Sequence, residues 1–183
     1  ACAAVNNTTV FQRRLPDGAS IYSAELTAII LALDLVKRDR NTKFFICTDS
    51  LSSLEAIKHR KLDQPFIQEI YSKLSKLTTL RKSILFLWTP GHIGIAGNER
   101  ADKAAREALK LDIFRMPLPW TDFKPKIKQL IQAKWLEDWN TKTTNKLHSI
   151  KPKLGPPTGR NLSRHWQTVL CRARIGHTHL THG

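Results

Sequence analysis

Two short, unbroken apolar runs do the most to limit what this chain can fold into. They are Phe44-Phe45-Ile46-Cys47 and Ile84-Leu85-Phe86-Leu87-Trp88. A run of this length without polar alternation is typical of a strand buried on both faces, as in a parallel sheet. The residues between the runs, 51–60 and 65–80, have apolar positions at helical spacing. The runs therefore predict parallel strands covered by helices.

The flanking segments complete an α/β pattern. Residues 1–5 and 8–15 are predicted strands joined at Asn6-Asn7, and residues 98–110 are a predicted alanine-rich helix. Another helix is predicted over 23–37, where apolar residues recur at helical spacing: Leu26, Ile29, Ile30, Leu33 and Val36. The order β-β-α-β-α-α-β-α predicts an α/β sandwich built on a mixed sheet flanked by helices.

The composition changes after Leu111, where prolines become frequent and strand patterns disappear. Residues 112–183 hold 13 Lys and Arg against four acids. We therefore predict two domains, an α/β domain over 1–111 and a basic helical extension over 112–183, with helices near 121–141 and 160–174.

The whole chain carries a formal net charge of +15, which favours an anionic partner, nucleic acid first. The alternative is a basic protein whose charge only keeps it soluble. No apolar run reaches the ~20 residues that span a membrane, and the start lacks a signal-peptide layout. The three cysteines are too few and too widely spaced for a disulfide framework or a paired-cysteine metal site. We expect an intracellular protein, in the cytoplasm or nucleus, without a membrane partner.

Four ionisable residues form the candidate site. Asp49 directly follows the first apolar run, at the strand end where open α/β sheets bind ligands. Glu25 is predicted in the first turn of its helix, and Asp102 in the first turns of another helix, after a loop that carries His92. If these ends converge, the carboxylates form an oxygen-rich pocket suited to Mg²⁺ or Mn²⁺. Two such ions can activate water for phosphodiester cleavage.

Each of these residues also has a simpler explanation. Glu25 can complement a helix dipole, and Asp49 can cap the helix that follows it. Asp102 can pair with Arg106 four residues later, and His92 can be a solvent-exposed loop residue. The functional interpretation therefore depends on the combination rather than on any single residue.

Three segments carry a family resemblance: SAELTAIILAL (23–33), FFICTDSLSSLEAI (44–57) and LWTPGHIGIAGNERADKAAREA (87–108). Together they resemble a type 1 ribonuclease H domain, specifically that of a non-LTR retrotransposon reverse transcriptase polyprotein. The resemblance covers roughly residues 1–110. It implies endonucleolytic hydrolysis of RNA in RNA–DNA hybrids, a ribonuclease H-like sheet, and a reverse transcriptase domain upstream in the polyprotein.

The resemblance also implies roles for individual residues. Glu25, Asp49 and Asp102 would bind two Mg²⁺ ions, with Mn²⁺ as a substitute, and His92 would assist proton transfer or product release. Ser50 and Asn98 would contact the hybrid.

The sequence departs from the family pattern in one respect. The family places its first metal-binding aspartate on a central strand, ahead of the residues that match Ala1–Val5, so we expect a fragment that lacks this strand. Asp17, in Pro16-Asp17-Gly18, is interpreted as a turn residue. The alternatives to the nuclease are an inactive nucleic-acid-binding remnant of the same fold and an integrase-like nuclease acting on DNA. The match of residues 89–102 favours the hybrid-cleaving group.

The end of the chain resembles the segment that follows the nuclease in such polyproteins. The resemblance rests on Ile150-Lys151-Pro152 and residues 174–183. No cysteine closely follows Cys171, so we expect no zinc site at His177, His179 and His182. Four tryptophans lie among basic residues, where they can pack helices or stack on bases, and packing is the favoured interpretation. They are Trp120, Trp135, Trp139 and Trp166.

Overall fold

The computed structural model describes residues 1–153, 155 and 161–176, and these form two compact units, Ala1–Phe123 and Lys124–Gly183. The predicted histidine-rich end, with His177, His179 and His182, lies outside the described residues. Among the helices of the described part, none combines the length and apolar character needed to cross a bilayer.

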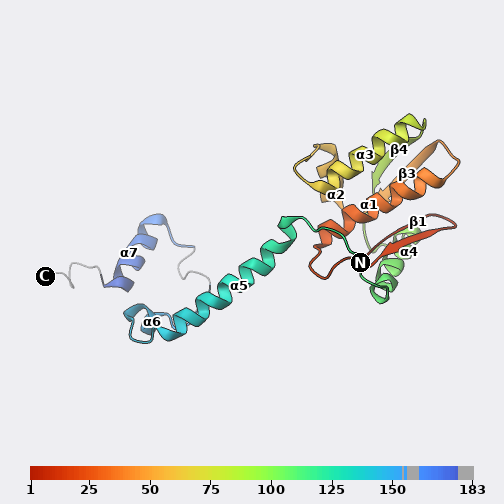
Figure 1. Ribbon diagram of the computed structural model, residues 1–183. Helices are drawn as coiled ribbons and strands as arrows, with labels where there is room; N and C mark the ends of the chain where they lie inside the picture. Colours follow the sequence, from red (N-terminus) through yellow and green to blue (C-terminus); the bar gives the residue numbers. More distant parts are fainter. Residues whose placement is uncertain (154, 156–160, 177–183) are drawn as a thin grey trace. The chain divides into compact units, whose positions relative to one another are not determined.

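The first unit follows the predicted order of strands and helices (Figure 1). Its bounds are β1 (Cys2–Val5), β2 (Val10–Arg13), α1 (Ile21–Arg38), β3 (Lys43–Thr48), α2 (Leu51–Lys58), α3 (Pro65–Thr79), β4 (Ser83–Trp88) and α4 (Ala96–Glu107), with a 3₁₀ turn at Ala108–Lys110. The mixed α/β character predicted from the apolar runs is therefore confirmed.

The strands form two separate pairs rather than one sheet. β1 pairs antiparallel with β2, and β3 pairs parallel with β4, with Phe45 opposite Leu85. The described residues contain no hydrogen-bonded strand between β1 and β3. The predicted parallel and antiparallel pairings are both present, but each pair keeps an edge without a strand partner.

The prediction that both faces of β3 and β4 are buried is wrong. Side chains alternate along the strands, and Phe45, Leu85 and Leu87 on one face are 69%, 53% and 39% exposed. Ile46, on the other face, is 7% exposed and belongs to the core. An apolar run indicates a strand but does not show whether a second layer covers it.

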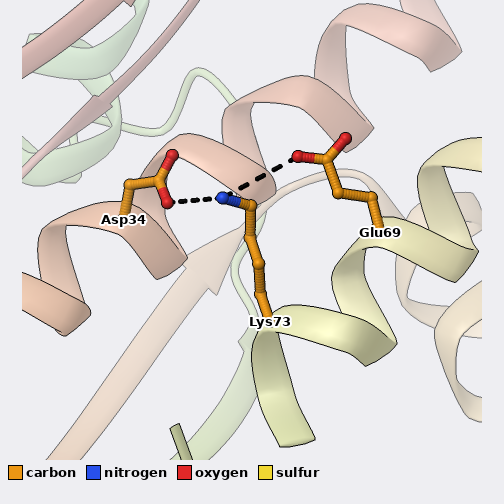
Figure 2. A network of polar contacts seen from close by, with 3 residues as sticks. All are labelled: Asp34, Glu69 and Lys73. Carbon is orange, nitrogen blue, oxygen red and sulfur yellow. Dashed lines mark hydrogen bonds and ion pairs between the residues drawn. The ribbon is translucent and has the colours of Figure 1, made fainter. Parts of the chain in front are cut away.

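Helix α1 is the centre of the core. It contacts both β1 and β3, and it packs along α3. Leu26 and Leu33 of α1, together with Ile67 and Ile70 of α3, are at most 1% exposed. Lys73 of α3 adds a polar link, with its Nζ 2.5 Å from Asp34 Oδ1 and 3.7 Å from Glu69 Oε1 (Figure 2).

Ser20 sets the start of α1 two residues before the predicted one. Its hydroxyl accepts a hydrogen bond from the Ser23 backbone N–H at 3.1 Å, which makes it the N-cap. The Asp122 carboxylate in turn accepts hydrogen bonds from the Ser20 N–H and hydroxyl, at 3.0 and 2.8 Å. Asp17 lies in the predicted turn and is 3.5 Å from Arg14.

Residues 112–123 belong to the first unit. Ile113 bridges to Arg14, and the Arg13 guanidinium lies 4.1 Å above the ring centre of Phe114. The compact unit thus runs to Phe123, past the change in composition at Leu111. The functional boundary between 111 and 112 stays a prediction.

The second unit is helical, as predicted. Its helices are α5 (Trp120–Thr141), which begins in the first unit, α6 (Lys146–Ile150) and α7 (Arg164–Ile175). None of the residues in α5, α6 and α7 that the structure describes is buried. Trp139 packs as predicted, since its indole N–H donates to the Lys151 carbonyl at 3.0 Å and its ring contacts His148. Trp135 and Trp166 are each 58% exposed and Trp120 is 69% exposed, so these rings form no core in the described part of the chain. Their packing against the first unit stays a prediction.

Candidate active site

Asp49 lies immediately beyond the carboxyl end of β3, as the sequence predicts. Its Oδ2 accepts a hydrogen bond from the Asn98 side-chain amide at 3.3 Å, and its backbone carbonyl accepts one from the Trp88 indole at 3.1 Å. The capping explanation is wrong, because Ser50 is the N-cap of α2 and its hydroxyl lies 2.7 Å from that of Ser53. The Asp49 carboxylate is therefore not used to start the helix.

Glu25 is the fifth residue of α1, so the prediction that it lies in the first turn is wrong. The cause is the Ser20 cap, which starts the helix at Ile21. The first turn of α1 contains no acid. Glu25 therefore lies beyond the turn where a carboxylate would complement the helix dipole, and this simpler explanation for Glu25 is wrong. Burial raises the pKa of the Glu25 carboxyl, and the charges of Asp49 and Asp102 raise it further.

Asp102 lies in the second turn of α4, and its Oδ2 is buried without a hydrogen-bond partner among the described residues. His92 Nδ1 lies 3.4 Å from this oxygen, close enough for an ion pair when the imidazole is protonated, although the geometry of a hydrogen bond is not met. The predicted pairing with Arg106 is not observed, because Arg106 Nε donates to the Asp102 backbone carbonyl at 3.4 Å. The buried oxygen is therefore free to accept from another group.

His92 lies in the loop between β4 and α4, and its side chain is 80% exposed. Its backbone has a φ of 56°, which is unusual for a residue with a Cβ atom. The described loop thus holds the imidazole at the surface, beside Asp102. The solvent-exposed interpretation and the functional one are both compatible with this position.

Gly91 is a residue beside the candidate site that the sequence interpretation did not single out. A Cβ atom at this position would lie 2.7 Å from Asp49 Oδ2, closer than a side chain can approach. The glycine therefore lets the loop pass directly against the Asp49 carboxylate. The signal was present, since Gly91 directly precedes His92 in the quoted Thr-Pro-Gly-His segment.

A groove of about 410 Å³ brings these groups together. β1 and β3 both line it along their length, α1 and α4 supply further walls, and Glu25, Asp49 and Asp102 all face it. Asn98 also lines the groove, whereas His92 and Ser50 do not. Three of the four predicted ionisable residues therefore share one cavity, with His92 beside the third.

The donor set fits a hard cation. Carboxylate oxygens are the ligands that Mg²⁺ and Mn²⁺ prefer. Burial is the main cause of the raised pKa of Glu25, and a cation would offset the further contribution from the charges of Asp49 and Asp102. The orphaned Asp102 Oδ2 is available as a ligand. In the described residues, however, no group of three His, Cys, Asp or Glu side chains is already arranged tightly enough to hold a metal ion.

A comparison with protein families finds a match to this region. A family model described as RNase H matches residues 1–110, which include β1 and run to the end of the 3₁₀ turn. The matched range contains every residue of the groove and the whole His92 loop.

Proposed function

The chain belongs to the RNase H family, and on this premise we propose that its α/β domain, residues 1–111, cleaves the RNA strand of RNA–DNA hybrids endonucleolytically, with two divalent metal ions. The observation that carries the proposal is the convergence of Glu25, Asp49 and Asp102 on one groove from three different elements. The raised pKa of Glu25 supports the same arrangement, because its causes include the charges of both other acids.

Glu25, Asp49 and Asp102 would hold the metal ions, and Mg²⁺ is the ion we expect. Bound in pairs, such ions supply an activated water and stabilise the leaving oxygen of a phosphodiester. The chain's own contribution is orientation. The Asn98 amide holds one oxygen of Asp49, and Gly91 lets the loop lie against the same carboxylate.

His92 would move protons at the edge of the site. Its Nδ1 is 3.4 Å from Asp102 Oδ2 and its ring is exposed, so it can meet both the site and solvent. Imidazole is the side chain suited to exchanging protons near neutral pH. We propose that it assists proton transfer or product release.

Substrate recognition would depend on the shape of the hybrid. Backbone phosphates and 2′-hydroxyls distinguish a hybrid from other duplexes without base readout. Ser50 and Asn98 are the proposed contacts, and both lie close to Asp49 in sequence or space. A nuclease with a preference for DNA is the weaker alternative, and faster cleavage of DNA duplex than of hybrid would favour it.

The wider setting is also a proposal. The resemblance of residues 23–33, 44–57 and 87–108 supports an origin in a retrotransposon polyprotein, with a reverse transcriptase domain upstream. We propose an intracellular protein that removes RNA from the hybrids made during reverse transcription.

A second candidate function is hybrid binding without cleavage. Two observations favour it: the sheet is divided between β1 and β3, and the acids among the described residues are not arranged tightly enough to hold a metal ion. In this case the groove retains the acids of an enzyme but binds metal too weakly for catalysis.

The deciding experiment incubates the purified chain with a labelled RNA–DNA hybrid and Mg²⁺, beside Asp49→Asn. Cleavage should fall by about two orders of magnitude or more in the variant, because a metal ligand loses its charge. Asp112→Asn is the matched control, since Asp112 is exposed and does not line the groove, and it should cleave as the parent does.

The outcomes separate the two functions. Cleavage by the parent but not by Asp49→Asn supports the nuclease. No cleavage by either, together with measurable hybrid binding, supports the binding function. If cleavage persists in Asp49→Asn, the proposed site is wrong.

A further inference from the structure

The second unit, Lys124–Gly183, carries most of the net positive charge of the protein. It contains 12 Lys and Arg against two acids, a formal balance of +10 out of the +15 of the whole chain. A cluster of this sign attracts polyanions and gains affinity by releasing counterions from phosphate. The charge therefore indicates the class of partner.

The described helices of this unit do not use their aromatic residues to build a core. No described residue of α5, α6 or α7 is buried. Trp139 has a structural role, since it donates to the Lys151 carbonyl and contacts the His148 ring. Trp135, four residues earlier, is 58% exposed. In the described part of the chain, its ring meets no other ring or cation, and its indole N–H donates no hydrogen bond.

The spacing along α5 places this exposed ring among cations. Lys124, Lys128 and Trp135 are four and seven residues apart, so they lie on one face of the helix. The rise of an α-helix puts Trp135 about 10 Å beyond Lys128 along the axis. Two ammonium groups followed by an exposed indole can hold phosphates and stack on an unpaired base.

We propose that the face of α5 formed by Lys124, Lys128 and Trp135 binds single-stranded nucleic acid, with the lysines on phosphates and Trp135 stacked on a base. A single strand is the favoured form because its bases are accessible for stacking, whereas those of a duplex are paired and stacked on each other. This inference concerns binding by the second unit and does not depend on the proposed cleavage by the first.

The test measures binding of the full chain to a labelled, unstructured 20-nucleotide RNA in EDTA, where no metal-dependent cleavage interferes. Trp135→Ala should weaken binding about tenfold, and Trp135→Phe should retain most of the affinity because it keeps an aromatic face. Lys128→Gln should reduce the slope of log affinity against log salt by about 0.7. Lys58→Gln, the same charge change on an exposed residue of α2, should leave affinity and slope unchanged.

Far-ultraviolet circular dichroism of each variant shows whether α5 keeps its helicity, so that a loss of binding is assigned to the side chain. Two results would overturn the proposal. One is equal affinity of Trp135→Ala and the parent. The other is displacement of the RNA by inorganic polyphosphate as effective as that by unlabelled RNA, since a polymer without bases offers nothing to stack on.

Discussion

The two units of this protein differ in how much apolar surface they bury and in the charge that they carry. Ala1–Phe123 buries two clusters of apolar side chains around α1, and three of its acids line one groove. Lys124–Gly183 has no buried residue in its described helices and carries a balance of +10. The first unit therefore has the rigid framework that a reaction site requires, whereas the second has the surface that a polyanion requires.

This difference shows where function can be placed at little cost to stability. Catalytic groups must be held in position, so they belong on elements that a core already fixes. Nonspecific binding of a charged polymer depends on the number of cations and on exposed rings, and it tolerates a helix with few tertiary contacts. The predictions below test whether the two units differ in this way.

The largest effect is expected for matched isoleucine truncations in the two units. Ile67 of α3 is 0% exposed in the core, so Ile67→Ala should lower the free energy of unfolding by about 2–5 kcal/mol. Ile131 of α5 is 63% exposed, so Ile131→Ala should change it by less than about 0.5 kcal/mol. Urea unfolding of both variants measures the difference. Equal losses would contradict the contrast drawn between the units.

A smaller effect is expected from the charge on Glu25. Its pKa is raised in the folded state, so the folded protein binds more protons than the unfolded chain between the two pKa values. Stability therefore falls as pH rises through this window, from just above the ordinary glutamate pKa to the raised one. Glu25→Gln should raise Tm relative to the parent at pH 7 and leave it unchanged at pH 4.

Adding Mg²⁺ distinguishes a metal site from simple repulsion. If the three acids hold the ion, Mg²⁺ should raise the Tm of the parent at pH 7 more than that of Glu25→Gln. Equal shifts in the two proteins would show that Glu25 is not a ligand, even where its raised pKa is confirmed.

Sequence patterns predicted the helices and strands better than they predicted which faces are covered and which strands pair. The spacing of Leu26 and Leu33 located the buried face of α1, because helix periodicity is a local property. The exposure of Phe45 and Leu85 could not be predicted, because it depends on which other element covers the sheet. The division of the sheet between β1 and β3 likewise depends on strand pairing between distant segments.

The sequence was enough to predict which acidic residues form the candidate site, but not which contacts they make. Glu25, Asp49 and Asp102 were identified from their positions at element ends, and the groove brings all three together. The approach of Gly91 to Asp49 joins residues 42 positions apart and follows only from the packing of the loop. The apolar spacing predicts the start of α1 two residues too late, because it does not include the Ser20 N-cap, although a serine just before an apolar helical pattern is a local signal for a cap.

The smallest effect is expected at the polar link between α1 and α3. Lys73 lies within 2.5 Å of Asp34 and 3.7 Å of Glu69, but all three side chains retain some exposure, so water weakens the attraction. Lys73→Met keeps the length of the side chain and should lower the free energy of unfolding by less than about 1 kcal/mol. Lys76→Met on the same helix is the matched control, because Lys76 is exposed and takes part in no ion pair among the described residues. The difference between the two variants should shrink in 1 M salt, where the Debye length is about 3 Å. A loss as large as that of Ile67→Ala would mean that charge, and not apolar burial, joins α1 to α3, and the view of the first unit as a framework built on its core would then be wrong.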